Sequence, residues 1–362
     1  MKKLLKLLSP FAPDHSGAVS ALFELGGLLV VCDAGGCTGN ICGFDEPRYF
    51  HAKCALFSAG LRDMDAILGQ DERLAGKVAQ ALEETGMPFA VLIGTPVPAV
   101  IATDFSALRK MVEKRASGKR CLAVETKGTA LYDEGVSLAF LQLVKTFALE
   151  RREVTKGRIG VWGATPLDLS FPDASRLVSA LVSSGKCGKK EEVFCYGMGA
   201  KIPEIEQASR CEKNLVIAPG GLAAAKELFR KFGTPYEVAY PCLPASLKRK
   251  MAEWKNRSAG RKEKVLIVHE QFAANAAREE LEKDGSPDWE IHTGTFFRFF
   301  PEYGRNGDLV FAGEEDFAEK LEKGNYTLLI ADEVFHRFLK EDSPAGFIPF
   351  THFAVSGRLE EE

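Results

Sequence analysis

Four cysteines lie close together near the N-terminus and are candidate metal ligands. Cys32, Cys37 and Cys42 have four residues between neighbours, and eleven residues separate Cys42 from Cys54. Cysteine thiolates are soft ligands that select iron-sulfur clusters or zinc. The spacing contains none of the tight two-residue pairs of zinc ribbons. The segment therefore predicts a metal site, with a [4Fe-4S] cluster as the leading assignment and zinc as the alternative.

Glycines between these cysteines support the same interpretation. Gly36 and Gly39 give a flexible backbone that can wrap around a cluster and leave its amide N–H groups free for a bound cofactor. Cys37 and Cys42, which have glycine and polar neighbours, are the stronger ligand candidates. Cys32 ends an apolar run and Cys54 begins another, so both are also candidates for core packing. A symmetric dimer offers a further arrangement, in which Cys37 and one neighbour from each copy share a cluster on the two-fold axis.

The elements that position this loop follow an α/β pattern. Short β-rich runs alternate with helical patterns of 10 to 18 residues, as expected for parallel sheets with crossover helices. The runs fall into three groups, which predict three doubly wound, Rossmann-like parallel-sheet domains at 1–150, 151–255 and 256–362. The expected strands are 28–32, 90–95 and 121–125 in the first group, 158–162, 192–196 and 214–218 in the second, and 264–269, 289–293 and 326–331 in the third.

Ligands of doubly wound sheets bind at the carboxyl ends of the strands. Thr95 follows one expected strand, and Gly220 lies in a Pro-Gly-Gly turn after another, so both are candidate cofactor contacts. His269 and His352 lie at or near strand ends of the third group and are candidates for proton donation, although each has a structural role as its simpler explanation. No dinucleotide fingerprint is complete, so NAD is not expected.

Composition limits the partners. The 47 basic and 50 acidic residues give a formal net charge of -3, which favours neither nucleic acid nor an anionic membrane. Residues 1–8 (MKKLLKLL) are expected to form a short amphipathic helix rather than a signal peptide, and no run is long enough to span a membrane. Clustered thiols in a chain of this kind predict a cytoplasmic protein. The basic segment 246–264 is expected to be a solvated linker helix, with a docking surface for an acidic partner as the alternative.

The order of several motifs resembles the nitrogenase component 1 family. Residues 30–40 (VVCDAGGCTGN) resemble the family's Gly-Cys loop, and residues 61–74 (LRDMDAILGQDERL) its following acidic and apolar segment. Residues 90–105 and 157–241 continue the match, and the third domain matches more weakly. The resemblance implies three stacked α/β domains, a cluster ligand at Cys37, an ATP-dependent iron-sulfur reductase as partner, and a homodimer or a heterodimer with a related subunit.

Departures from the family pattern affect the expected chemistry. The early loop at 10–19 has no cysteine, and Pro96 stands where the family's late cluster ligand is expected. Ala218 lies where nitrogenases bind their iron-molybdenum cofactor through a cysteine, so dinitrogen reduction is not expected.

Three hypotheses follow. The first is a nitrogenase-like oxidoreductase component that accepts electrons from the reductase and reduces a substrate in an interdomain cleft. The second is a non-catalytic scaffold or carrier for the assembly of a metal cluster or cofactor. The third is a small-molecule-binding or structural α/β protein whose cysteines belong to its core.

Overall fold

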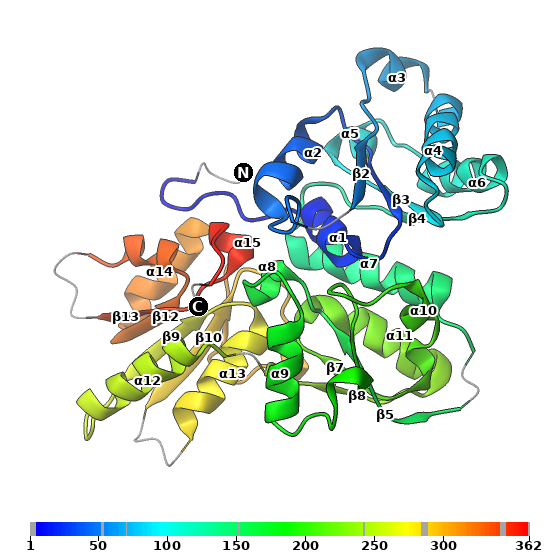
Figure 1. The fold of residues 1–362 in the computed structure, drawn as a ribbon. Coiled ribbons are helices and arrows are strands. Elements are labelled where there is room, and N and C mark those ends of the chain that lie inside the picture. Colours follow the sequence, from blue (N-terminus) through cyan, green and yellow to red (C-terminus); the bar gives the residue numbers. More distant parts are fainter. Residues whose placement is uncertain are drawn as a thin grey trace.

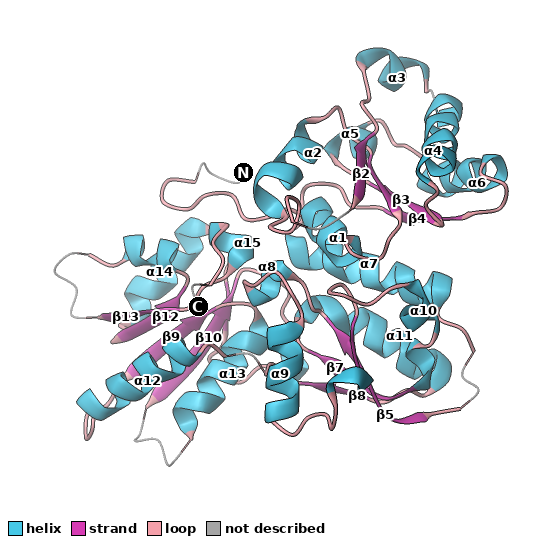
Figure 2. Ribbon diagram, viewed as in Figure 1, coloured by secondary structure: helices cyan, strands magenta, loops and turns pink. Residues whose placement is uncertain are grey.

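The structure, a computed structural model, describes residues 5–51, 54–69, 71–150, 153–241, 243–283, 289–340 and 345–360 (Figure 1). It contains three parallel sheets, each formed by one part of the chain. Figure 2 shows each sheet lying between helices. The expected α/β fold with three doubly wound parallel sheets is confirmed.

The first sheet has the order β2-β1-β3-β4. Every residue of β1 and β3 is buried, which explains why these strands are continuous apolar runs rather than alternating ones. Helix α4 buries Leu74, Ala75, Val78 and Leu82 on one face, as its helical spacing predicts. The elements of this unit are α1 (Asp14–Leu22), β1 (Leu28–Val31), α2 (Gly36–Asn40), the π-helical turn η1 (Ile41–Asp45), β2 (Ala55–Ser58), α3 (Asp63–Leu68), α4 (Asp71–Thr85), β3 (Phe89–Ile93), α5 (Pro96–Val100), α6 (Phe105–Arg115), β4 (Arg120–Val124) and α7 (Tyr132–Phe147).

The second sheet has the order β6-β5-β7-β8 and is again entirely parallel. Its elements are β5 (Thr155–Trp162), α8 (Pro166–Leu169), α9 (Ser175–Ser183), η2 (Lys190–Glu192), β6 (Val193–Cys195), α10 (Ile202–Glu206), η3 (Ala208–Arg210), β7 (Cys211–Val216), η4 (Pro219–Gly221), α11 (Leu222–Phe232) and β8 (Tyr236–Val238).

The third sheet has five parallel strands in the order β11-β10-β9-β12-β13. Its elements are α12 (Ala245–Arg257), β9 (Lys264–Val268), α13 (Gln271–Glu282), β10 (Glu290–Thr295), η5 (Pro301–Tyr303), β11 (Leu309–Val310), α14 (Glu314–Gly324), β12 (Leu328–Ala331), η6 (Glu333–Phe338), β13 (Gly346–Pro349) and α15 (Phe353–Ser356). The basic segment forms α12, which buries Leu247 and Met251 and packs on α13 and β13, while Lys248 and Lys250 stay exposed.

Helix α7 joins the first two units. It lies beside α1 in the middle of the molecule and also packs against α11 (Figure 1). A Cβ atom at Gly17 would lie 2.0 Å from the carbonyl oxygen of Tyr132, and one at Gly135 would lie 1.7 Å from that of Asp14. Only glycine permits this approach of α1 and α7, because any side chain would push the two backbones apart.

The N-terminal segment differs from its expected structure. Residues 6–8 are bends, residue 5 is irregular, and residues 1–4 lie outside the described part of the chain. The backbone amides of Lys6, Leu7 and Leu8 donate to the carboxylate of Glu314 on α14, at 2.9 to 3.1 Å. The amide of Ala12 donates to the carbonyl of Ala354 at 2.9 Å. These backbone hydrogen bonds hold the segment against the third unit, where local helical propensity cannot compete with them.

The hydrophobic core is continuous across the three units. One cluster of buried side chains includes residues of α1, α7, β5, α11, β9 and α14. Separate smaller clusters lie on the outer face of each sheet. Among the helices that the structure describes, none is long and apolar enough to cross a bilayer.

Candidate functional site

The cysteine loop leaves the end of β1 through a tight turn. Gly35 has φ +115°, in the region that glycine alone adopts easily, and it starts α2. The buried carboxylate of Asp33 accepts hydrogen bonds from the amide of Thr38 at 2.8 Å and from the hydroxyl of Ser58 at 2.6 Å. These bonds fix α2 against the end of β2. The helix then continues into η1, so that Cys37 and Cys42 lie on two successive helical turns.

The four cysteines do not converge on one point. Cys32 is buried in the core between the first sheet and helices α4 and α6, in the same cluster as Cys121. Cys37 is partly buried near Asp33 and Asp14, whose charges act on its pKa. Cys42 and Cys54 lie near each other, and the Cys42 thiol contacts the hydroxyl of Tyr49.

Burial opposes ionisation of the Cys32, Cys37 and Cys54 thiols. It raises the pKa of both Cys32 and Cys54 to about 12. Burial, followed by the charges of Asp33 and Asp14, also raises the pKa of Cys37. Since a metal binds the thiolate form, ligation in one chain would have to offset this cost.

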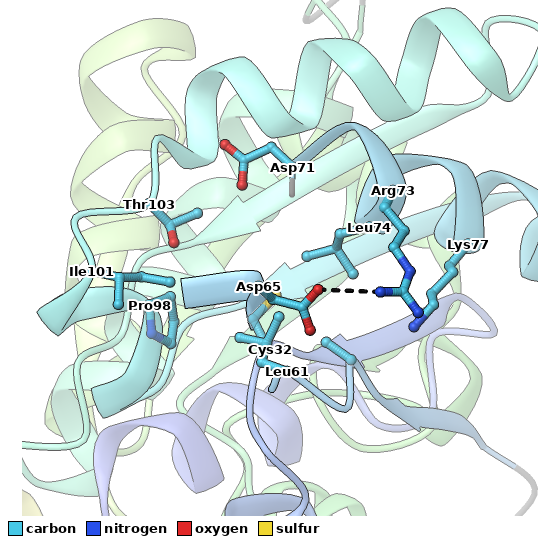
Figure 3. A pocket seen from close by; sticks show the side chains of 11 residues that line it. Cys32, Leu61, Asp65, Asp71, Arg73, Leu74, Lys77, Pro98, Ile101 and Thr103 are labelled. Carbon is cyan, nitrogen blue, oxygen red and sulfur yellow. Dashed lines mark hydrogen bonds and ion pairs between the residues drawn. The ribbon is translucent and has the colours of Figure 1, made fainter. Parts of the chain in front are cut away.

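Cys32 lines a small pocket. A pocket of about 30 Å³ adjoins this cysteine between α4 and the end of β3 (Figure 3). Asp65 and Arg73 face each other across it, with their nearest oxygen and nitrogen atoms 3.5 Å apart. A volume of this size holds roughly two or three water molecules. A metal cluster has no room there.

The fit of an iron-sulfur or zinc centre to a single chain is therefore poor. Nowhere in the described ranges do three or more histidine, cysteine, aspartate or glutamate side chains come together as metal ligands. Of the four cysteines, Cys37, Cys42 and Cys54 are partly exposed, and Cys32 is buried. The choice of ligands among the four cysteines stays a prediction.

A buried arginine attaches the cysteine loop to the second unit. The guanidinium of Arg48 donates to Glu46 at 2.7 Å, to the carbonyl of Ser20 at 2.7 Å and to that of Gly197 at 2.9 Å. Glu24 completes this network by accepting from Arg48 at 3.2 Å. The charges of the Glu46 and Arg48 side chains act on the nearby Cys54. The loop that carries Cys42 and Cys54 is thus fixed to both units.

The other predicted cofactor contacts lie in different surroundings. Gly36 and Gly39 have open space where a Cβ would be. Thr95 is buried, and its hydroxyl donates to the carbonyl of Cys32 at 2.7 Å, which ties β3 to β1. A Cβ at Gly220 would lie 2.6 Å from Cγ1 of Val136, so this glycine lets η4 pack on α7. Thr95 thus contacts the backbone of Cys32 at the start of the cysteine loop, whereas Gly220 lies at the contact with α7.

A wide cleft opens between the first and third units. Its volume is about 1270 Å³. One wall is formed by η1 and residues 128–131, the opposite wall by Phe296, residues 311–316 and residues 353–357. The N-terminal segment, residues 5–13, forms the third wall and runs from the third unit to α1 (Figure 1). Cys42 lies on the η1 turn that supplies the first wall, so the cysteine loop and the cleft share an element.

A buried polar network involves residues next in sequence to some that line this cleft. The hydroxyl of Tyr132 on α7 donates to Asp168 of α8 at 2.7 Å and lies 2.9 Å from Nε2 of His352. Asp168 also accepts from the hydroxyl of Thr165 at 2.7 Å. The ring of His269 stacks on that of His352, with the ring centroids 4.1 Å apart. Each of the three units contributes to this network, and Leu131 and Phe353, the chain neighbours of two of its members, line the cleft.

Burial disfavours the charged forms of the carboxyl and imidazole groups in and near this network. It raises the pKa of Asp168 to about 7, against which the hydrogen bonds from Thr165 and Tyr132 act. Burial likewise raises the pKa of Asp133 to about 6 and lowers that of His269 to about 3. The pKa of His352 lies well below its usual value for the same reason. Both histidines are therefore neutral at pH 7, while Asp168 titrates near neutrality and can hold or release a proton there.

Sequence reasoning named the two histidines singly but missed Tyr132 and Asp168. Asp168 was missed because it follows Thr165 and Pro166 in a helix-start pattern, where an aspartate is explained by local interactions at the start of the helix. Tyr132 starts a long helix, where a tyrosine gives no signal of its own. What joins them is the packing of three units that are distant in sequence.

Three parallel sheets with a cleft and a polar junction between them define a three-unit α/β protein of the Rossmann-like class. The profile of the family described as "Nitrogenase component 1 type Oxidoreductase" matches residues 13–283, which is more than half of the chain. The chain belongs to the nitrogenase component 1 type oxidoreductase family, so the expected family is confirmed. Members of this family generally bind iron-sulfur clusters, and they pair with an iron-protein reductase and form oligomers.

Solved structures agree on the fold. The chain is similar to "Nitrogenase Cp1 at pH 6.5", with 13% sequence identity and a TM-score of 0.70, over 97% of this chain and 87% of that one. It is also similar to "Nitrogenase Cp1 at pH 5", with 12% identity and a TM-score of 0.65, over 96% and 84% of the two chains. At such identities the likeness establishes the fold alone. The search of the curated proteins gave no match.

Proposed function

We propose that the protein is a cytoplasmic nitrogenase-like component that accepts electrons from an ATP-dependent iron-sulfur reductase and reduces a substrate in the cleft between its first and third units. The observation that carries this proposal is the shared element η1. This turn bears Cys42 and, through Gly43, Phe44 and Asp45, lines the cleft of about 1270 Å³. Family membership supplies the class of partner.

The metal centre of this proposal belongs to two chains rather than one. A single chain offers Cys37 and Cys42 as partly exposed thiols but no complete ligand set among its described residues. In a symmetric dimer each copy would contribute Cys37 and one neighbour, which gives the four thiolates of a [4Fe-4S] cluster. Such a cluster would supply electrons when bound.

Reduction of an organic substrate also needs protons, and the residues behind the cleft are suited to supply them. Asp168 has a pKa of about 7 and is hydrogen-bonded to Tyr132, which in turn contacts His352. A group that is half-protonated at neutral pH is a suitable proton store. Leu131 and Phe353, which line the cleft, are the chain neighbours of Tyr132 and His352 in this network.

The test is metal analysis and reduction of anaerobically purified protein. Wild type should contain about two irons per chain, as a four-iron cluster shared by a dimer requires. Cys37→Ala should lose this iron, whereas the matched variant Cys121→Ala, in a buried strand of the same unit, should keep it. A nitrogenase-type iron protein should reduce the centre, as read by electron paramagnetic resonance, only when ATP is present.

Two outcomes would contradict the proposal. Iron that no ATP-dependent reductase reduces would favour the alternative, a scaffold or carrier for cluster or cofactor assembly. If neither wild type nor Cys37→Ala contains iron, or if both contain stoichiometric zinc, the redox role is rejected. The cleft would then be a binding site without a redox centre.

A further inference from the structure

Helix α12 and the turn that follows it form a basic surface on the third unit. Residues 245–262 contain seven basic residues and one acidic residue, in a chain whose formal net charge is -3. Leu247 and Met251 anchor the helix in the core, where they are 1% and 2% exposed. Five cations of this segment are exposed to solvent, and together they are called the α12 basic surface: Lys248, Arg249, Lys250, Arg261 and Lys262.

These five cations have no carboxylate partner among the residues that the structure describes. The one acid of the helix, Glu253, lies 3.8 Å from Arg257 and pairs with that residue instead. Helix α14 is also highly charged, but Lys320 and Lys323 on it pair with acids of the same helix. The charges of the α12 basic surface are thus available to an external anion.

The position of the cations does not serve the stability of the helix. Helix α12 begins at Ala245 without an acidic residue in its first turn. Lys248, Arg249 and Lys250 follow within the first two turns. Because the N-terminal end of a helix carries partial positive charge, cations near it lower the stability of the helix. An anionic partner would offset this cost.

The chemistry of the surface favours an acidic protein segment over a membrane or a nucleic acid. Amphipathic helices that bind membranes bury an apolar face in the lipid, whereas Leu247 and Met251 are buried in the protein. Sites for single-stranded nucleic acid stack the bases on aromatic rings. The aromatic residue of α12, Trp254, packs its ring on Gly346 of β13, where a Cβ would lie 2.1 Å from it. The negative net charge of the chain also opposes the binding of a long nucleic acid.

We propose that the α12 basic surface docks an acidic segment of a partner protein, at a place separate from the cysteine loop. The 13 residues of the helix span about 20 Å, which roughly six extended residues of a partner would cover. Figure 1 shows α12 at the outer edge of the third unit, far from α2. No residue of α12 lines the cleft. The inference therefore goes beyond the proposed function, since a partner held here covers neither the Cys37 loop nor the cleft.

The experiment measures the binding of short peptides to the full-length protein. Fluorescein-labelled hexaglutamate and hexaglutamine are titrated at low salt, and binding is followed by fluorescence anisotropy. Hexaglutamate should bind and hexaglutamine should not, because the two peptides share the dye and the length but differ in charge. Added salt should weaken the binding, as expected for exposed charges.

Matched variants locate the surface. Lys248→Gln combined with Lys250→Gln should weaken hexaglutamate binding roughly fivefold, which is the size expected for two exposed ion pairs. Lys110→Gln combined with Lys114→Gln on α6 removes the same number of exposed lysines elsewhere and should leave the affinity unchanged. The α12 variant should unfold at the same urea concentration as wild type or a higher one, because it loses cations near a helix N-terminus. Weaker binding therefore does not come from loss of the fold.

Three outcomes would overturn the proposal. Absence of hexaglutamate binding, or an equal loss in the two double variants, would leave α12 as a solvated helix. Tighter binding of hexathymidylate than of hexaglutamate would assign the surface to nucleic acid. Binding to phosphatidylserine vesicles but not to hexaglutamate would assign it to a membrane. These measurements need neither iron nor the reductase, so their result is separate from that of the redox test.

Discussion

Neutralising Asp168 should remove most of the pH dependence of stability that the three-unit junction creates. The carboxyl is 1% exposed, and burial raises its pKa from the usual 3.8 to about 7. A carboxyl whose pKa is raised on folding stabilises the folded state while it is protonated. Its contribution is complete below pH 4 and is lost as the pH rises through 7. With these two pKa values, the free energy of unfolding falls by about 2.5 kcal/mol between pH 5 and pH 8.

The replacement Asp168→Asn keeps the shape and still accepts the hydrogen bond from Tyr132, so it removes the titration but little packing. The free energy of unfolding is measured by urea titration at pH 5, 6, 7 and 8, where circular dichroism and tryptophan fluorescence give the same midpoint. The difference between wild type and variant should change by about 2.5 kcal/mol over this range. Asp133, whose raised pKa of about 6 acts with the same sign, is present in both proteins, so the difference retains only its charge interaction with Asp168.

Asp63→Asn, on the exposed helix α3, controls for the loss of one negative charge and should show a constant difference from wild type. The reasoning is refuted if Asp168→Asn gives a difference that stays within about 0.5 kcal/mol from pH 5 to pH 8, since a buried carboxyl with an ordinary pKa would behave in that way.

Three further predictions concern the N-terminal segment held by Glu314, the contact of Gly220 with α7, and the buried thiol of Cys32. Glu314→Gln weakens the charge-assisted bonds to the amides of residues 6–8, so the hydrogen exchange of these amides should accelerate roughly tenfold. Burial alone would raise the pKa of Glu314, but the hydrogen bonds from these amides outweigh it and lower the pKa. Wild type should therefore show the same faster exchange as the pH falls through that lowered pKa. Gly220→Ala places a methyl group 2.6 Å from Cγ1 of Val136 and should cost about 1–3 kcal/mol in urea unfolding, whereas Gly188→Ala, whose nearest atom is 3.9 Å away, should be close to neutral. Cys32, with a pKa of about 12, should react with a disulfide reagent at pH 8 at least roughly tenfold more slowly than the partly exposed Cys42, as mass spectrometry of labelled peptides would report.

Local patterns in the sequence predict much of the fold. The helical patterns of residues 71–85 and 222–232 predict helices with the same bounds as α4 and α11, and the apolar runs at 28–32 and 264–269 contain β1 and β9. These elements carry their own signal, because a buried parallel strand is a continuous apolar run and an amphipathic helix has its own period. Short edge strands such as β11, with two residues, give no such signal.

The candidate site was less predictable, because its groups are joined only by tertiary packing. Spacing along the chain places four thiols on one loop, yet Cys32 points into the core behind the sheet while Cys37 lies on the other side. Side chains alternate between the faces of a strand, and a helix turn then rotates the next thiol away. Tyr132 and His352 are separated by 220 positions, so their contact depends on how the three units dock.

The π-helical turn η1 couples the two parts of the proposed function. It carries Cys42 toward Tyr49 and Cys54, and it places Phe44 and Asp45 on the cleft. Its ends are held, since Asp45 accepts from Ser16 of α1 and the amide of Glu46 donates to the carbonyl of Ile41 at 3.0 Å. Turns of this type are locally less stable than α-helix and often occur at functional sites. A ligand that covers Phe44 would therefore shift the conformational equilibrium of η1, the turn that orients the Cys42 thiol. Because coupling between two binding sites is reciprocal, a metal bound at that thiol would in return change the affinity of the cleft for the ligand.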